Sequence, residues 1–257
     1  MCVGIHGVEG YYGSAVQLAW LRYHAQRLRD DVQVVLIHAL NPYGFSYNRR
    51  VNEDNIDLNR NFIDFDQCLP KNPQYMEWAP HLVSQPGVSG SEGAKQYLQA
   101  MIEKNPDRCP SAIWSGQYED DSGLFWGGRG PSWSNRVFKQ IMEQYGQDKK
   151  HVMFVDLHTG YGNYGDVEVY SLSESNSQHH RRVKKWFSMA DHIVPTPYEI
   201  VGSLTNYVSD YFKERVDAKI VIECGTKHMP ETTLPSLLAE HWLECQKNNG
   251  LHEEGNS

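Results

Sequence analysis

A histidine and a glutamate stand three positions apart almost at the beginning of the chain. His6 and Glu9 lie in HGVEG, whose glycines permit a sharp turn directly after the short apolar run VGI. Imidazole nitrogen and carboxylate oxygen are both zinc ligands, and a catalytic zinc keeps three protein ligands and one position for water. The pair therefore fits two ligands of a metal site, although on this fragment alone an ordinary polar turn is the more common explanation.

A third ligand has to come from another part of the chain, and His158 in DLHTG is the natural candidate. It ends the apolar run HVMFVDLH, much as His6 ends VGI. Asp156 precedes it by two positions, so both side chains would lie on the same side of a strand. This carboxylate could orient a ligand histidine, or it could simply be bonded by nearby backbone N–H groups.

The segment RVNEDNIDLNRNF at 50–62 concentrates Arg50, Asn59 and Arg60 in one loop. The planar fork of arginine binds a carboxylate through two parallel hydrogen bonds, so Asn59 and Arg60 fit a clamp for a substrate carboxylate. Arg50 could separately stabilise an oxyanion beside zinc. The alternative is a loop held together by ion pairs with its own aspartates, namely Asp54, Asp57, Asp64 and Asp66.

Glu223 ends another apolar run, IVIECGT. A carboxylate at such a strand end can point into a cleft beside a metal, where it could take a proton from metal-bound water and pass it to a leaving amine. A surface glutamate at the end of a strand is the alternative.

These residues need a scaffold that brings distant segments together, and the apolar patterns predict one. Runs of strand length alternate with helical patterns; the runs are 3–5, 32–40, 151–158, 166–172 and 218–224. The first helix is predicted to start at Ser14, with Gln17 at capping-box spacing, and 41–73 is predicted to be a long functional loop. Alternation predicts an α/β fold with a mostly parallel sheet and helices on both faces. Its sites lie beyond the carboxyl ends of the strands. Without a repeat or linker, we expect a single domain over 1–257.

The bulk composition excludes several classes of partner. The 257 residues carry a net charge of −8 without a block of like charge, so the basic patch typical of nucleic-acid binding is absent from the sequence. No stretch reaches the roughly 18 apolar residues of a membrane span, and we expect no membrane partner. The five cysteines are scattered without a C-x-x-C pair, which fits free thiols in a reducing compartment. With no signal-peptide pattern at the start, we expect a cytoplasmic protein.

Together, HGVEG, RVNEDNIDLNRNF, DLHTG and IECGT resemble the zinc carboxypeptidase superfamily in order, residue type and approximate spacing. DLNRNF is the most specific piece. The run GLFWGGRGPSWSNRVF at 123–138 is similar to a little-studied, mainly bacterial branch described only as a domain of unknown function. The resemblance extends from residue 3 to about 226. It implies the superfamily's mixed, mostly parallel twisted sheet, here with a shortened N-terminal edge because only five residues precede the first histidine.

The resemblance also implies a role for each residue. One Zn²⁺ ion would be held by three ligands: His6, Glu9 and His158. Arg50 would polarise the scissile carbonyl and hold the developing oxyanion. Asn59 and Arg60 would grip the terminal carboxylate of the substrate, and Glu223 would act as general base and then general acid.

The implied activity is a zinc-dependent hydrolase, a metallopeptidase of carboxypeptidase type that cleaves an amide bond next to a free carboxylate. Its partner would be a peptide or acyl-amino acid substrate with that carboxylate. An N-acyl amino acid deacylase or a cell-wall peptide amidase would share the scaffold, and a non-catalytic zinc- or carboxylate-binding protein is the alternative of another class. We expect Tyr198 and Tyr207 to be packing residues, whereas His228 could reach the cleft.

Overall fold

The computed structural model describes residues 1–82, 90–106, 108–171, 177–187, 200–226, 234–242 and 244. Within them, four strands form one sheet in the order β1-β2-β4-β3. Their bounds are Cys2–Val3 for β1, Val152–Thr159 for β2, Val167–Tyr170 for β3 and Val216–Cys224 for β4. Strands β1 and β4 run parallel to β2, and β3 runs antiparallel to β4. The predicted mixed, mostly parallel sheet is therefore confirmed.

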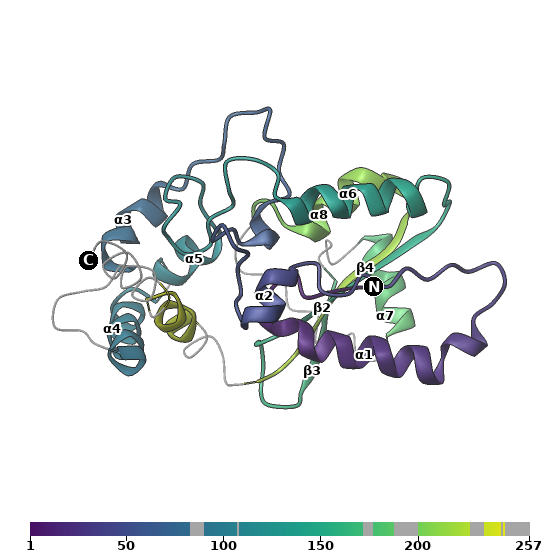
Figure 1. The fold of residues 1–257 in the computed structure, drawn as a ribbon, viewed down its shortest axis with the longest axis horizontal. Helices are drawn as coiled ribbons and strands as arrows, with labels where there is room; N and C mark the ends of the chain where they lie inside the picture. Colours follow the sequence, from purple (N-terminus) through teal and green to yellow (C-terminus); the bar gives the residue numbers. More distant parts are fainter. Residues whose placement is uncertain are drawn as a thin grey trace, which may run out of the picture.

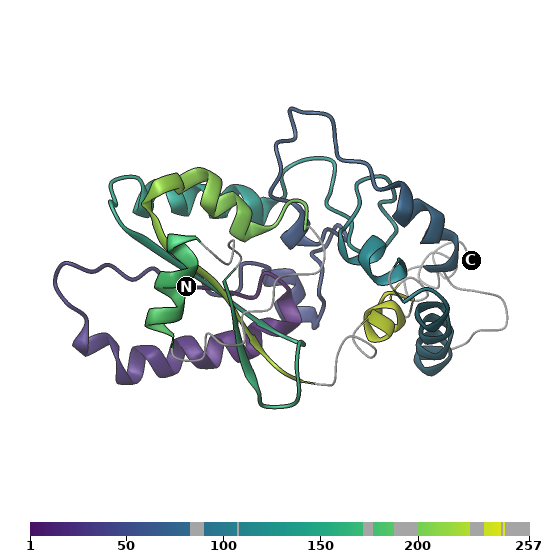
Figure 2. The same ribbon diagram turned by 180° about the vertical axis from the view of Figure 1, so that it is seen from behind.

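Helices cover both faces of this sheet, as predicted (Figures 1 and 2). On one face lie α1 (Gly10–Tyr23) and α7 (Gln178–Trp186), and on the other lie α6 (Trp133–Gly146) and α8 (Leu204–Phe212). The last three begin at a serine whose hydroxyl accepts a hydrogen bond from the backbone N–H three positions on, which is the preferred N-cap contact. These serines are Ser132, Ser177 and Ser203.

Apolar side chains of the sheet hold the helices in place. Phe154 of β2 is buried with Phe138 of α6 and Val208 of α8. Ile220 of β4 is buried with Val183 of α7. Because successive side chains of a strand point to opposite faces, each of the two central strands packs against both helical layers.

A second apolar cluster lies beside the sheet, on the side where β1 ends and α1 begins (Figures 1 and 2). It joins α3 (Pro73–Leu82), α4 (Gly90–Lys104), α5 (Cys109–Trp114) and the helical residues 234–242. Its core is buried and includes Tyr75, Leu98, Ile113, Leu238 and Trp242. We call it the helical cluster. The single domain over 1–257 stays a prediction.

The predicted strand at 32–40 is wrong. The segment is extended beside β1, but only one bridge forms, between Cys2 and Ile37. Val32 is 45% exposed, so the segment is not the buried strand that its apolar run predicts. The reason is its position: it lies along the outer edge of β1, a strand of only two residues that offers too short a partner for a ladder.

The start of the first helix also differs from the prediction. α1 begins at Gly10, and Ser14 and Gln17 lie inside it without forming a capping box. The Gln17 amide instead donates to the carbonyls of Met1 and Ile37, so it ties the helix to the edge of the sheet.

The segment 41–73 is more ordered than a long loop. It contains α2 (Pro42–Tyr47) and the 3₁₀ turn η3 (Leu58–Arg60). Asn41 caps α2 by accepting the N–H of Gly44, with proline at the first helical position. None of the described helices combines the length and the apolar character needed to cross a membrane.

Candidate metal centre

The His6–Glu9 pair is built by a tight turn at the end of β1. The 3₁₀ turn η1 (Gly7–Glu9) follows the strand after three residues, the last of which is His6, and leads into α1. Gly7 has no space for a side chain, because a Cβ there would lie 1.9 Å from the carbonyl carbon of Gly44 in α2. This close approach fixes the turn so that His6 Nδ1 lies 2.9 Å from Glu9 Oε1.

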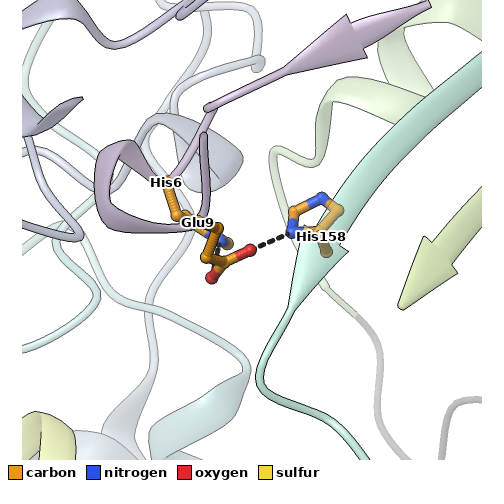
Figure 3. Close-up of side chains that lie close together, drawn as sticks. All are labelled: His6, Glu9 and His158. Carbon is orange, nitrogen blue, oxygen red and sulfur yellow. Dashed lines mark hydrogen bonds and ion pairs between the residues drawn. The ribbon is translucent and has the colours of Figure 1, made fainter. Parts of the chain in front are cut away.

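His158 completes the group from the end of β2. Its Nδ1 lies 2.9 Å from Glu9 Oε2, although 149 positions separate the two residues (Figure 3). The two imidazole rings meet edge to face with their centroids 5.0 Å apart. One ligand atom from each of His6, Glu9 and His158 lies within 4.8 Å of the others. The structure therefore brings the three predicted ligands together.

The second nitrogen of each imidazole is held by a fully buried aspartate. His6 Nε2 lies 3.2 Å from Asp57 Oδ1, and His158 Nε2 lies 3.0 Å from Asp156 Oδ2. A carboxylate on the far nitrogen fixes the ring and leaves Nδ1 to bind a cation. Two Nδ1 atoms and one carboxylate are donors that suit zinc, so the residues present fit a single ion of this kind.

Nearby positive charges hold the carboxylates of Glu9 and Asp57 in their ionised form. Burial alone would raise the pKa of Glu9, but His6 and His158 outweigh it and hold the pKa below its ordinary value. Burial opposes ionisation of Asp57 too, yet Arg50 and His6 keep its pKa well below the usual range. The Glu9 carboxylate is thus ionised and available as a cation ligand.

Arg50 lies at the edge of this group. Its Nε donates to Asp57 Oδ2 at 3.0 Å, and its Nη1 lies 3.6 Å from Glu9 Oε1. The guanidinium also stands over the Phe125 ring, 5.1 Å from the centroid. The sequence left two alternatives for this arginine: an ion pair within its own loop, or a position beside the candidate metal ligands. The structure shows both at once.

Asn59 and Arg60 lie on η3, which begins directly after its N-cap residue Asp57. The Asn59 side-chain oxygen accepts the N–H of Leu204. Arg60 is only 2% exposed and donates to the carbonyls of Asn59 and Trp114 at 2.8 and 2.6 Å. Both side chains therefore have structural contacts, and their predicted grip on a substrate carboxylate stays a prediction.

Glu223 lies directly beside His158, because the two residues are register partners of β4 and β2. Among the described residues, its Oε2 is buried and has no hydrogen-bond partner. Burial is the largest cause that raises the pKa of Glu223, to about 8. A shielded carboxylate with one oxygen unpaired among the described residues, next to the candidate ligand His158, suits proton transfer.

Asp57 is the site residue whose place sequence reasoning missed. Its Oδ1 faces His6 and also accepts the N–H of Asn59, while its Oδ2 pairs with Arg50. The local signal was the spacing of Asp57 and Asn59, which is typical of an aspartate that caps a short turn. Of the other candidates, Tyr207 packs against Phe62 as expected, whereas Tyr198 and His228 lie outside the described residues.

Comparison with solved structures finds similar chains, among them the following two. The murein-tripeptide amidase MpaA from Escherichia coli O157 is 16% identical, with 93% of this chain and 78% of that chain covered at a TM-score of 0.43. Bovine thrombin-activatable fibrinolysis inhibitor, in complex with tick carboxypeptidase inhibitor, is 15% identical, with 97% and 82% covered at a TM-score of 0.47. With TM-scores below 0.5, these likenesses carry no weight for function, which has to come from the site residues.

Sequence comparison is more decisive about the family. A search of curated protein sequences finds no match. A family model described as "Protein of unknown function (DUF2817)" matches residues 1–256. This confirms the predicted membership of a branch known only as a domain of unknown function, and the chain belongs to the DUF2817 family.

Proposed function

We propose that this protein is a zinc-dependent hydrolase that cleaves an amide bond next to a free carboxylate. One observation carries the proposal: His6, Glu9 and His158 converge on one point, and on the neighbouring strand Glu223 has a carboxylate oxygen without a hydrogen-bond partner in the described part of the chain. A cluster of metal ligands alone would suit a structural site, but no hydrogen bond from the described residues to Glu223 Oε2 explains why this carboxylate is buried beside the cluster.

The metal would be held by His6 Nδ1, His158 Nδ1 and the Glu9 carboxylate. Bound there, zinc supplies Lewis acidity, which polarises a carbonyl and lowers the pKa of a water molecule. Asp57 and Asp156 keep the two imidazoles in the orientation that exposes Nδ1.

The remaining steps belong to Glu223 and Arg50. Glu223 accepts the proton of the attacking water at its Oε2 and then delivers it to the leaving amine. Arg50 lies 3.6 Å from Glu9, and its guanidinium stabilises the oxyanion that develops on the substrate carbonyl. Its ion pair with Asp57 fixes the guanidinium before substrate arrives.

The substrate class follows from the proposed clamp. Asn59 and Arg60 would bind the free carboxylate of a peptide, an N-acyl amino acid or a cell-wall peptide. Activity should therefore require that carboxylate, whichever acyl group stands on the other side of the amide.

The test combines metal content with hydrolysis. We expect about one zinc per chain by elemental analysis and turnover of at least one member of a panel of dipeptides, N-acyl amino acids and muropeptides. The same substrate with its carboxylate converted to an amide should resist cleavage. Glu223→Gln should keep the zinc and lose turnover, whereas Glu214→Gln, which changes an exposed glutamate, should behave as wild type. Zinc without turnover in either form would support a binding protein instead.

A further inference from the structure

The turn that carries His6 and Glu9 is held from outside by the backbone of two arginines. The N–H of Val8 donates to the Arg49 carbonyl at 3.0 Å, and the N–H of Gly7 donates to the Arg50 carbonyl at 3.4 Å. The first N–H groups of a helical turn have no partner within the turn, and no side chain caps η1. The 49–50 backbone therefore takes the place of a cap.

The same two residues point their side chains in different directions. Arg50 faces the metal centre through Asp57. Arg49 faces the helical cluster, where its Nε donates to Glu240 Oε1 at 3.1 Å and its Nη1 lies 2.7 Å from Glu244 Oε1. Glu240 and Glu244 are one helical turn apart and bracket the guanidinium.

The ion pairs of Arg49 with Glu240 and Glu244 are shielded from solvent enough to hold a fixed geometry. The Arg49 side chain is 11% exposed. Burial raises the pKa of Glu240, and Arg49 and the backbone of Arg50 counter that shift as hydrogen-bond donors. An exposed ion pair contributes little, but an arginine fork between two part-buried carboxylates fixes geometry as well.

We propose that Arg49, held by Glu240 and Glu244, is a positioning residue that sets the place of the metal-binding turn and of Arg50. The helical cluster thereby acts on the candidate metal ligands through Arg49. The inference rests on the metal site of the proposed function, but its test measures metal binding and needs no turnover.

The first measurement is zinc affinity by chelator competition. We expect Arg49→Gln to weaken zinc binding about tenfold, the scale found when groups that orient metal ligands are removed. Arg49→Lys keeps the charge without the planar fork and should recover part of the loss. The double variant Arg49→Gln/Glu240→Gln should lose no more than Arg49→Gln, because both changes remove one contact. Arg108→Gln, which breaks an exposed pair with Glu77 in the same cluster, is the matched control.

The second measurement is the visible absorption spectrum of the cobalt-loaded protein, which reports the geometry of the ligands. It should change in Arg49→Gln and stay as in wild type in Arg108→Gln. A residue that served stability alone would lower the unfolding temperature and leave both readouts unchanged.

The outcomes separate this inference from the proposed function. A folded Arg49→Gln that binds zinc as tightly as wild type, or losses that add in the double variant, would overturn the inference and leave the function standing. Failure of the wild type to bind zinc would overturn both. If Arg49→Gln does not fold, Glu244→Gln, which leaves Glu240 on the guanidinium, takes its place with an expected loss of about threefold, and an unchanged affinity there overturns the inference equally.

Discussion

His158 and Glu223 face each other across two parallel strands, as register partners of β2 and β4. Their side chains share one face of the sheet, and Glu9 reaches His158 Nδ1 there. The apolar runs on both strands thus end at the same level, with the candidate metal ligand His158 on one and the proposed proton-transfer residue Glu223 on the other.

The titration of Glu223 should be visible in the stability of the metal-free protein. Its folded pKa of about 8 lies above its ordinary value of 4.5. A group whose pKa is raised by folding contributes stability that is present below the ordinary pKa and is lost as the pH rises through the folded one. In chelator, the free energy of unfolding of wild type relative to Glu223→Gln should therefore fall between about pH 4.5 and 8. Urea denaturation over this range measures it, and a constant difference would contradict the burial of this carboxylate.

Metal removal should destabilise the wild-type protein. A ligand bound only by the folded state adds about 2.7 kcal/mol when its free concentration is 100 times its Kd. Chelator should therefore lower the melting temperature of wild type and leave that of His158→Ala unchanged. His151→Ala removes an exposed histidine next to the same strand, and it should keep both the zinc and the response to chelator. Equal zinc content in the two variants would show that His158 is not a metal ligand.

Asp57→Asn should weaken zinc binding about 10- to 100-fold, because the amide loses the charge that orients His6 and fixes Arg50. Chelator competition measures the change. Asp54→Asn alters an exposed carboxylate of the same loop and should leave zinc affinity within about twofold of wild type. Similar affinities for the two variants would show that Asp57 has no part in holding the ligand.

Gly7→Ala should disrupt the turn η1, which follows His6 and contains Glu9, through packing alone. The added methyl group would lie 1.9 Å from a backbone carbon of α2, and backbone cannot move aside as a flexible side chain can. We expect a loss of about 2 kcal/mol or more in the free energy of unfolding, together with weaker zinc binding. Gly130→Ala is the control, since a Cβ at Gly130 meets nothing within 4 Å. Equal stability of the two variants, measured by urea denaturation, would contradict the close approach of η1 and α2.

The central strands were readable from the sequence because their signal is local. HVMFVDLH and AKIVIEC are rich in β-branched and apolar residues, and they form β2 and β4 with His158 and Glu223 near the ends. The serines before α6, α7 and α8 also indicate where these helices begin, since an N-cap hydrogen bond joins residues only three positions apart. The three candidate metal ligands could be named because their residue types already restrict the chemistry.

Other features depend on contacts between distant segments, which no local pattern records. The run 32–40 has the composition of a buried strand, yet its neighbour is a two-residue edge strand, so it stays half-exposed. The guanidinium of Arg60 donates to the carbonyl of Trp114, 54 positions away, a contact that no local pattern predicts. In the sequence, Asp57 is one of several loop aspartates, and only the fold brings it into contact with His6, 51 positions away. The sequence thus determined which groups are present, and the tertiary structure decided their partners, because a hydrogen bond depends on position in space.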